Sequence, residues 1–181
     1  MKGLSKPQQT ENIMDEAQFT DIVRRYRDHL FAIAFQYTKN AADADDMAQI
    51  ALLKCYQAAA PFESEAHIRH WLIRVTVNEC KRYLVSPWRR YTAPIEDYAE
   101  TLGFETPEQS ALFLAVMELP QKYRVPIHLY YYEDYSVREI AGILGIRESA
   151  VQTRLLRARR KLKDKLEGER LKMRSRGYPF P

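Results

Sequence analysis

The sequence of 181 residues has few of the features that mark secreted, membrane or metal-binding proteins. Its two cysteines, Cys55 and Cys80, lie far apart in helical patterns, so neither a disulfide framework nor a CxxC ligand pair is expected. No apolar run is long enough to span a membrane, and the N-terminal stretch MKGLSKPQQTENIMDE lacks the apolar core of a signal peptide. Strand-type alternation is also missing. These absences predict an all-α, soluble, cytoplasmic protein whose two thiols are reduced and buried.

Charged residues are unevenly distributed along the chain, although the net charge is only +4. Residues 67–90 contain several Lys and Arg and a single acid, Glu79. In residues 91–110 every charged residue is acidic, whereas residues 151–162 contain five basic residues and no acid. This order of basic, acidic and basic segments is uncommon for an enzyme with one small substrate. It favours two modules that face DNA and a connector of opposite charge.

The spacing of apolar residues predicts a first helical domain over residues 19–88. One helix is expected from Phe19 to Thr38, and a second from the acidic stretch KNAADADD to about Ala60. A third is expected from about Ile68 to Val85. Residues 1–18 are polar and are expected to form a disordered extension.

A flexible acidic linker is expected over residues 89–108, because this stretch has little apolar periodicity and begins and ends near prolines. A second small helical domain follows over residues 109–167. Its first helix is predicted from Ala111 to Leu119, and its second starts at Pro120, with Pro126 expected to interrupt it. Residues 168–181 are expected to form a loose tail.

The second domain ends in a helix-turn-helix pattern, SVREIAGILGIRESAVQTRLLRARRKL. Ser136 is a candidate N-cap and Glu139 completes a capping box. Gly145 suits the left-handed position at the end of the first helix. The second helix is expected to start at Glu148 or Ser149.

The polar face of that second helix is strongly basic, which is the property of a helix that lies in the major groove of DNA. The alternative is a solvated helical hairpin, whose charges only confer solubility. Such faces usually mix both signs, and this one has no acid from Val151 to Leu162. Motif and charge together therefore favour nucleic-acid binding.

Taken in order, these motifs resemble bacterial RNA polymerase sigma factors of the extracytoplasmic-function (ECF) group, in the sigma-70 superfamily. The segments DADDMAQIALLKCY and HIRHWLIRVTVNECKRYL are similar to two helices of region 2. Leu119-Pro120, Arg124 and the helix-turn-helix are similar to region 4. The resemblance covers residues 19–166. It implies an alternative sigma factor that directs promoter-specific initiation in response to an envelope or extracytoplasmic stress.

The resemblance also implies roles for particular residues of the first domain. The acidic start of its second helix would bind the clamp helices of the polymerase's largest subunit, although an acidic helix start also matches the helix dipole without any partner. The third helix and the loop before it would capture melted −10 DNA, with Trp71 either wedged against the duplex or packed in the core. The polymerase-binding residues are Asp43, Asp45, Asp46 and Gln49, and the −10 residues are Phe62, Glu63, Ser64, Glu65, Ala66, Trp71, Arg74, Asn78, Lys81 and Arg82.

For the second domain, the resemblance implies contacts with the −35 element and with the flap of the second-largest polymerase subunit. Arg can read guanine and Gln can read adenine in the major groove, whereas Arg154 and Arg159 are expected to meet phosphates or acidic partners. The −35 residues are Ser149, Gln152, Thr153, Arg154, Leu156 and Arg157. An anti-sigma factor, anchored in the membrane, is the expected inhibitor. Neither a cofactor nor enzymatic activity is expected.

Two other classes of protein remain as alternatives. An ordinary helix-turn-helix regulator would explain residues 136–165, but neither the basic third helix nor the acidic connector. A metal hydrolase would use the acids of the second helix with His67 and His70, which is a weak ligand pattern.

Overall fold

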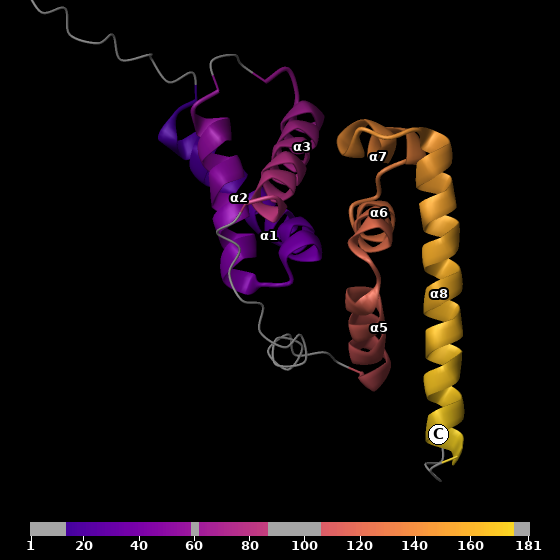
Figure 1. Ribbon diagram of the computed structural model, residues 1–181. Helices are drawn as coiled ribbons and strands as arrows, with labels where there is room; N and C mark the ends of the chain where they lie inside the picture. Colours follow the sequence, from indigo (N-terminus) through magenta and orange to yellow (C-terminus); the bar gives the residue numbers. More distant parts are fainter. Residues whose placement is uncertain (1–13, 59–61, 87–105, 176–181) are drawn as a thin grey trace, which may run out of the picture.

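The computed structural model describes residues 14–58, 62–86 and 106–175. Over these ranges the chain forms seven α-helices and no strand, as the sequence predicts (Figure 1). Most of the predicted linker, residues 87–105, lies outside the described residues, as does most of the predicted N-terminal extension.

The first module consists of α1 (Glu16–Thr38), α2 (Ala41–Tyr56) and α3 (Glu65–Leu84). Helix α1 starts earlier than expected, because Asp15 and Gln18 form a capping box at its N-terminus. Part of the predicted disordered extension is therefore helical. Helix α2 ends before the predicted Ala60.

Helix α3 also starts earlier than its apolar pattern indicates. Ser64 accepts a hydrogen bond from the backbone N–H of His67 and caps the helix. Glu65 and Ala66, predicted to lie in a loop, therefore form the first turn of α3. An N-cap at Ser64 is a stronger local signal than the first apolar residue, Ile68.

The second module consists of α5 (Pro107–Glu118), α6 (Gln121–Tyr131), α7 (Val137–Leu144) and α8 (Glu148–Ser175). Pro126 was expected to interrupt α6, but the helix continues past it to Tyr131. A proline removes one backbone donor, and the burial of Val125, Ile127 and Leu129 around it offsets that loss. Helix α8 runs on to Ser175, so the predicted tail is helical over much of its length.

The helix-turn-helix forms as the sequence predicts. Ser136 and Glu139 make the capping box of α7, and Gly145 ends that helix in the left-handed conformation with φ 69°. Val151, Leu155 and Ala158 of α8 are fully buried against the other helices of the module. The helix-turn-helix is thus specified by local capping residues and by the apolar stripe of α8.

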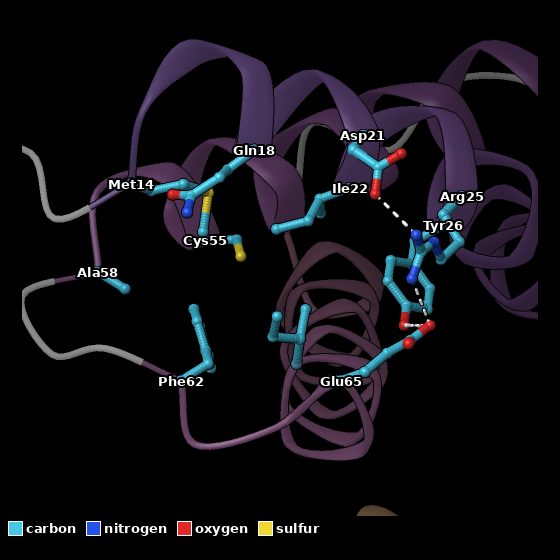
Figure 2. A pocket seen from close by; sticks show the side chains of 11 residues that line it. Met14, Gln18, Asp21, Ile22, Arg25, Tyr26, Cys55, Ala58, Phe62 and Glu65 are labelled. Carbon is cyan, nitrogen blue, oxygen red and sulfur yellow. Dashed lines mark hydrogen bonds and ion pairs between the residues drawn. The ribbon is translucent and has the colours of Figure 1, made fainter.

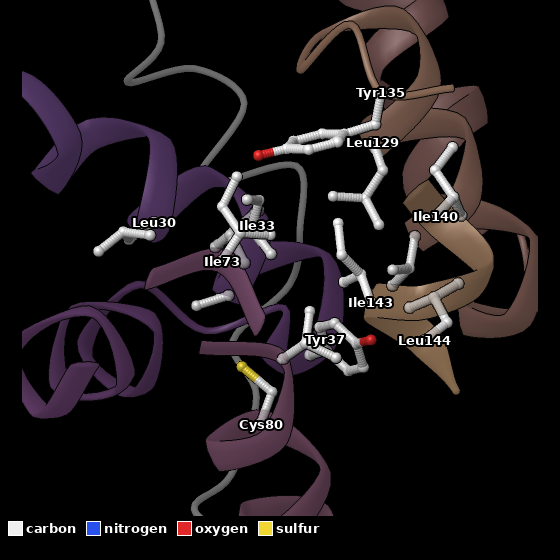
Figure 3. Close-up of a cluster of buried hydrophobic side chains, with 14 of the residues drawn as sticks. Leu30, Ile33, Tyr37, Ile73, Cys80, Leu129, Tyr135, Ile140, Ile143 and Leu144 are labelled. Atoms are coloured by element: carbon white, nitrogen blue, oxygen red, sulfur yellow. The ribbon is translucent and has the colours of Figure 1, made fainter. Parts of the chain in front are cut away.

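The two modules pack against each other. In Figure 3, side chains of α1 and α3 face side chains of α6 and α7 across one continuous buried cluster. Helix α1 contacts α6, and α3 contacts α7. The sequence predicts two domains on a flexible linker, and it contains no local signal of this interface.

Candidate nucleic-acid interface

Helix α3 exposes one polar stripe along its length. Arg74, Asn78, Lys81 and Arg82 are all exposed, and their spacing of three to four residues places them on the same helical face. The opposite face is buried through Leu72, Ile73, Thr76, Val77 and Cys80. The α3 stripe therefore presents an amide and three cations together, which suits a nucleic acid strand.

The predicted capture loop lies beside a cavity of about 350 Å³ (Figure 2). Its apolar walls include Phe62 of the loop and, across the cavity, Met14 and Ile22. At its rim, Glu65 accepts hydrogen bonds from Arg25 at 2.5 Å and from the hydroxyl of Tyr26 at 3.3 Å. The remaining residues around this cavity are Gln18, Asp21, Cys55, Ala58 and Ile68.

The arginine at the rim also fixes the charge of Glu65. Its hydrogen bond and its positive charge lower the pKa of Glu65 below the ordinary value, so this carboxylate is ionised at neutral pH. Glu63 and Ser64 are exposed next to it, with the backbone N–H of Glu63 near Nδ1 of His67. The loop and the first turn of α3 thus combine an aromatic ring, an apolar cavity and an anchored carboxylate.

Trp71 is half-buried. It is therefore neither fully packed in the core nor fully free to wedge against a duplex, the two alternatives that the sequence leaves open. Its ring meets Phe62 edge-on at a centroid distance of 5.4 Å. Trp71 therefore supports the loop residue that lines the cavity, and part of its own ring stays accessible at the end of the α3 stripe.

Two of the predicted phosphate-binding cations already have protein partners. Lys81 donates a hydrogen bond to the backbone oxygen of Leu144, at the end of α7, over 2.9 Å. Arg82 is paired with Glu79 at 3.1 Å, and Glu79 also binds Lys54 at 2.6 Å. Because Arg82 remains largely exposed, its guanidinium can exchange this pairing for a phosphate.

Helix α8 presents the predicted −35 residues on its outer face. Ser149, Gln152, Thr153, Leu156 and Arg157 are exposed, and Leu156 keeps 65% of its accessible surface. Arg154 differs from the others, because it is half-buried and its charge acts on Tyr37 and Lys81 of the first module.

The acidic start of α2 divides into structural and accessible residues. Asp43 is only 2% exposed and accepts a hydrogen bond from the hydroxyl of Tyr83 at 2.6 Å. Asp45 binds Arg27 at 2.8 Å and the amide of Gln49 at 2.6 Å. We therefore assign Asp43 to the core of the first module, because a buried carboxylate cannot meet a partner surface. Asp45, Asp46 and Gln49 remain at or near the surface.

Among the described residues, no group of three or more His, Cys, Asp or Glu side chains is arranged to hold a metal ion. The acids of α2 and the pair His67 and His70 do not come together in one such group. In the same part of the chain, no helix is both long and apolar enough to cross a membrane.

Reasoning from the sequence assigned no structural role to two buried charged residues, although Arg124 is among the residues that resemble region 4. Arg124 of α6 is buried and donates hydrogen bonds to backbone oxygens of α1 and α5. Glu133, in the turn before α7, is buried and binds His29 and Arg69 of the first module. An arginine inside the apolar run of α6 is a signal for the first residue. No local pattern marks Glu133.

Two family models match the chain, and each covers one of the modules. Residues 22–90 match Sigma-70 region 2, and residues 109–162 match Sigma-70, region 4. The first match includes the α3 stripe and the capture loop, and the second includes the helix-turn-helix. An ordinary helix-turn-helix regulator would not explain the first match.

Curated relatives cover most of the chain. It is 31% identical over 150 residues to the ECF RNA polymerase sigma factor SigM of Mycobacterium tuberculosis, across 82% of this chain and 76% of that one. It is 29% identical over 170 residues to the ECF RNA polymerase sigma-E factor of Escherichia coli, across 84% and 88% of the two chains.

Solved structures share the fold. The sigma factor RpoE in complex with the anti-sigma factor NepR from Bartonella quintana matches with a TM-score of 0.64 and 18% identity, over 82% of this chain and 96% of that one. CnrH in complex with the cytosolic domain of CnrY matches with a TM-score of 0.59 and 24% identity, over 85% and 90%.

Proposed function

Because the chain belongs to the ECF group of sigma-70 RNA polymerase sigma factors, we propose that its two modules divide promoter recognition between them. The α3 stripe and the cavity beside Phe62 take the melted −10 element. The outer face of α8 reads the −35 element. Members of this family are transcription regulators rather than enzymes, and the protein itself carries out no covalent chemistry.

One observation carries this proposal: each module exposes a separate face suited to nucleic acid. On α8, Gln152, Leu156 and Arg157 point outward, while Val151 and Leu155 anchor the helix. On α3, the cations and Asn78 lie on the face opposite the core. Hydrogen-bonding, apolar and charged side chains on one helix match the major-groove edges of a short promoter element.

The cavity beside the capture loop supports recognition of single-stranded DNA. A base that leaves the stack needs an apolar or aromatic wall and a few polar groups for its edge. Phe62 and Ile22 offer the wall, and Gln18 and the anchored Glu65 offer the polar groups. We propose that this cavity receives one unstacked base of the −10 element.

Transcription with core RNA polymerase tests the proposal directly. We expect specific run-off transcripts from genomic fragments only when this protein and core polymerase are both present. The protein alone should bind duplex promoter DNA weakly, because the polymerase must set the spacing between the two modules. Tight, sequence-specific binding to a palindrome without polymerase would instead identify an ordinary regulator.

Replacing Asn78 tests the −10 face. We expect Asn78→Ala to reduce open-complex formation by about tenfold, since a lost base contact costs about 1–3 kcal/mol. Binding to core polymerase should stay unchanged, because the proposed partner of Asn78 exists only in melted DNA. Permanganate footprinting measures the melted strand, and Arg24→Ala, an exposed position on α1, serves as the control. If Asn78→Ala opens the promoter as well as the parent, the residue has no such contact.

The remaining partners are protein surfaces. We propose that Asp45, Asp46 and Gln49 meet the clamp helices of the largest polymerase subunit, and that the second module meets the flap of the second-largest. We further propose an anti-sigma factor as the inhibitor, since RpoE of Bartonella quintana was solved in complex with the anti-sigma factor NepR. We propose that this inhibitor is anchored in the membrane, since CnrH was solved with only the cytosolic domain of CnrY. Competition between such an inhibitor and core polymerase for this protein, measured by pull-down, tests that last assignment.

A further inference from the structure

The two modules bury a shared apolar surface instead of standing apart (Figure 3). Ile33, Tyr37 and Ile73 of the first module face Leu129 and Ile143 of the second. All five side chains are almost completely inaccessible to solvent. Apolar burial of this kind holds the modules together without fixing their register.

A buried carboxylate lies at the edge of this surface and adds directional contacts. Glu133 of the second module is only 2% exposed. Its carboxylate contacts Nδ1 of His29 at 3.1 Å and Nη2 of Arg69 at 3.3 Å, and its backbone oxygen accepts a second hydrogen bond from Arg69 at 2.6 Å. Both partners belong to the first module. Nε2 of His128, from the same module as Glu133, lies 3.6 Å from the carboxylate.

The backbone next to this carboxylate is shaped for the contact. Asp134 adopts the left-handed conformation with φ 54°, which is uncommon for residues other than glycine. The turn allows Glu133 and Tyr135 on either side of it both to reach the first module, where the guanidinium of Arg69 lies 4.8 Å from the centre of the Tyr135 ring. Burial alone would raise the pKa of Glu133, but hydrogen bonds and positive charge from His128 and His29 outweigh it and leave the pKa below its ordinary value. The carboxylate is therefore ionised at neutral pH.

The closed arrangement also engages residues that the proposed function gives to DNA. The ammonium of Lys81 is held by the backbone oxygen of Leu144. Burial and the nearby Arg154 lower the pKa of Lys81 below its ordinary value. The interface thus holds the cations Lys81 and Arg154 close together, and their repulsion opposes the closed arrangement. In an open arrangement, both cations would be available to phosphates.

Promoter geometry cannot be met in this closed arrangement. Elements centred 35 and 10 base pairs upstream are separated by about 85 Å of B-form DNA, at about 3.4 Å per base pair. A compact chain of this length has a radius of gyration of about 16 Å and hence a diameter of about 40 Å. The modules must therefore separate before α3 and α8 can occupy both elements.

We propose that Glu133, with His29 and Arg69, forms a latch that holds the free protein closed, and that binding to core polymerase and promoter requires this latch to open. The role given to the open form rests on the proposed function, whereas the latch itself does not depend on it. Closed molecules withhold Lys81 and Arg154 and keep the two DNA-facing helices too close together. The protein thereby limits its own binding to stray DNA when polymerase is absent.

Förster transfer within the free, full-length protein tests the latch. Dyes are attached at Leu53→Cys on α2 and Asp164→Cys on α8, both exposed positions in different modules. Burial raises the pKa of Cys55 to about 11 and of Cys80 to about 12, so the native thiols react slowly and labelling is selective. We compare the labelled parent with Arg69→Met, Glu133→Gln and the control Arg24→Met, which removes an exposed charge from α1.

We expect Arg69→Met and Glu133→Gln each to raise the ratio of open to closed molecules by at least threefold, and Arg24→Met to leave it unchanged. Apparent affinity for core polymerase should rise in proportion to the open fraction. Circular dichroism checks that the helices persist, and Arg69, being partly exposed, is the variant least able to disturb folding. Unchanged transfer in both latch variants, with helicity intact, overturns the latch. Absence of run-off transcription with the expected transfer change overturns the proposed function and leaves the latch standing.

Discussion

Arg124→Met should lower the free energy of unfolding by about 3–5 kcal/mol, because it leaves three buried acceptors unpaired at about 1–3 kcal/mol each. Arg124 is 3% exposed and contacts no carboxylate among the described residues. Its guanidinium instead donates to the backbone oxygens of Gln36, Met117 and Leu119, over 2.8, 3.0 and 2.8 Å. Methionine fills a similar volume but leaves these three oxygens without their donor.

The reason for so large an effect lies in where those oxygens are. Gln36 is in the last turn of α1, and Met117 and Leu119 are at the end of α5. Neither helix has a basic residue in its own last turn. Arg124 therefore supplies the positive charge and the donors that two helix C-termini require. Burial lowers its pKa to about 10, which still leaves the guanidinium charged at neutral pH.

Thermal and urea denaturation of the full chain measure this effect. For a protein of this size, we expect the Tm to fall by roughly 10 °C. Arg124→Lys keeps the charge but cannot donate to three oxygens at once, so the stability of this variant should lie between those of Arg124→Met and the parent. Arg138→Met, at an exposed position on α7, should change stability by less than about 0.5 kcal/mol. Equal stabilities for Arg124→Met and Arg138→Met would contradict the role given to Arg124.

The helix-turn-helix could be predicted from sequence because its signals are local. The capping box of Ser136 and Glu139 spans three residues, and the left-handed Gly145 ends α7 immediately afterwards. The apolar stripe of α8 repeats every three or four residues, so one segment defines both its buried and its exposed face. For the same reason, the spacing alone places Gln152, Thr153, Leu156 and Arg157 on the outer face of the helix.

The packing between the modules could not be predicted from sequence. His29 and Glu133 are separated by 104 residues, and Lys81 and Leu144 by 63. Apolar residues that face another helix of the same module and those that face the other module have the same helical spacing. The weak periodicity of the connector predicts a linker, but it gives no information on whether the modules touch. The burial of Asp43 was missed for a related reason, since its partner Tyr83 lies on another helix.

Arg157→Ala and Gln152→Ala should each relax the sequence preference at particular positions of the −35 element, by about 10- to 100-fold in relative transcription. This follows because one good base contact is worth about 1–3 kcal/mol of discrimination. The nearby guanidinium of Arg157 lowers the pKa of the Tyr123 phenol below its ordinary value. The hydroxyl of Thr153 donates to the backbone oxygen of Ser149, so Thr153 offers its methyl group rather than its donor.

Arg160→Ala is the matched control, because Arg160 is exposed further along the same helix and carries the same charge. A phosphate contact at Arg160 should weaken binding to every sequence alike and reduce the slope of affinity against salt by about one unit. The measurement is transcription from a promoter library randomised across the −35 element, with each variant at two salt concentrations. A base contact changes which sequences are enriched at both salts, whereas a phosphate contact changes only their yield. If the preferences of Gln152→Ala and Arg157→Ala both equal those of the parent, α8 does not read the −35 element through these residues.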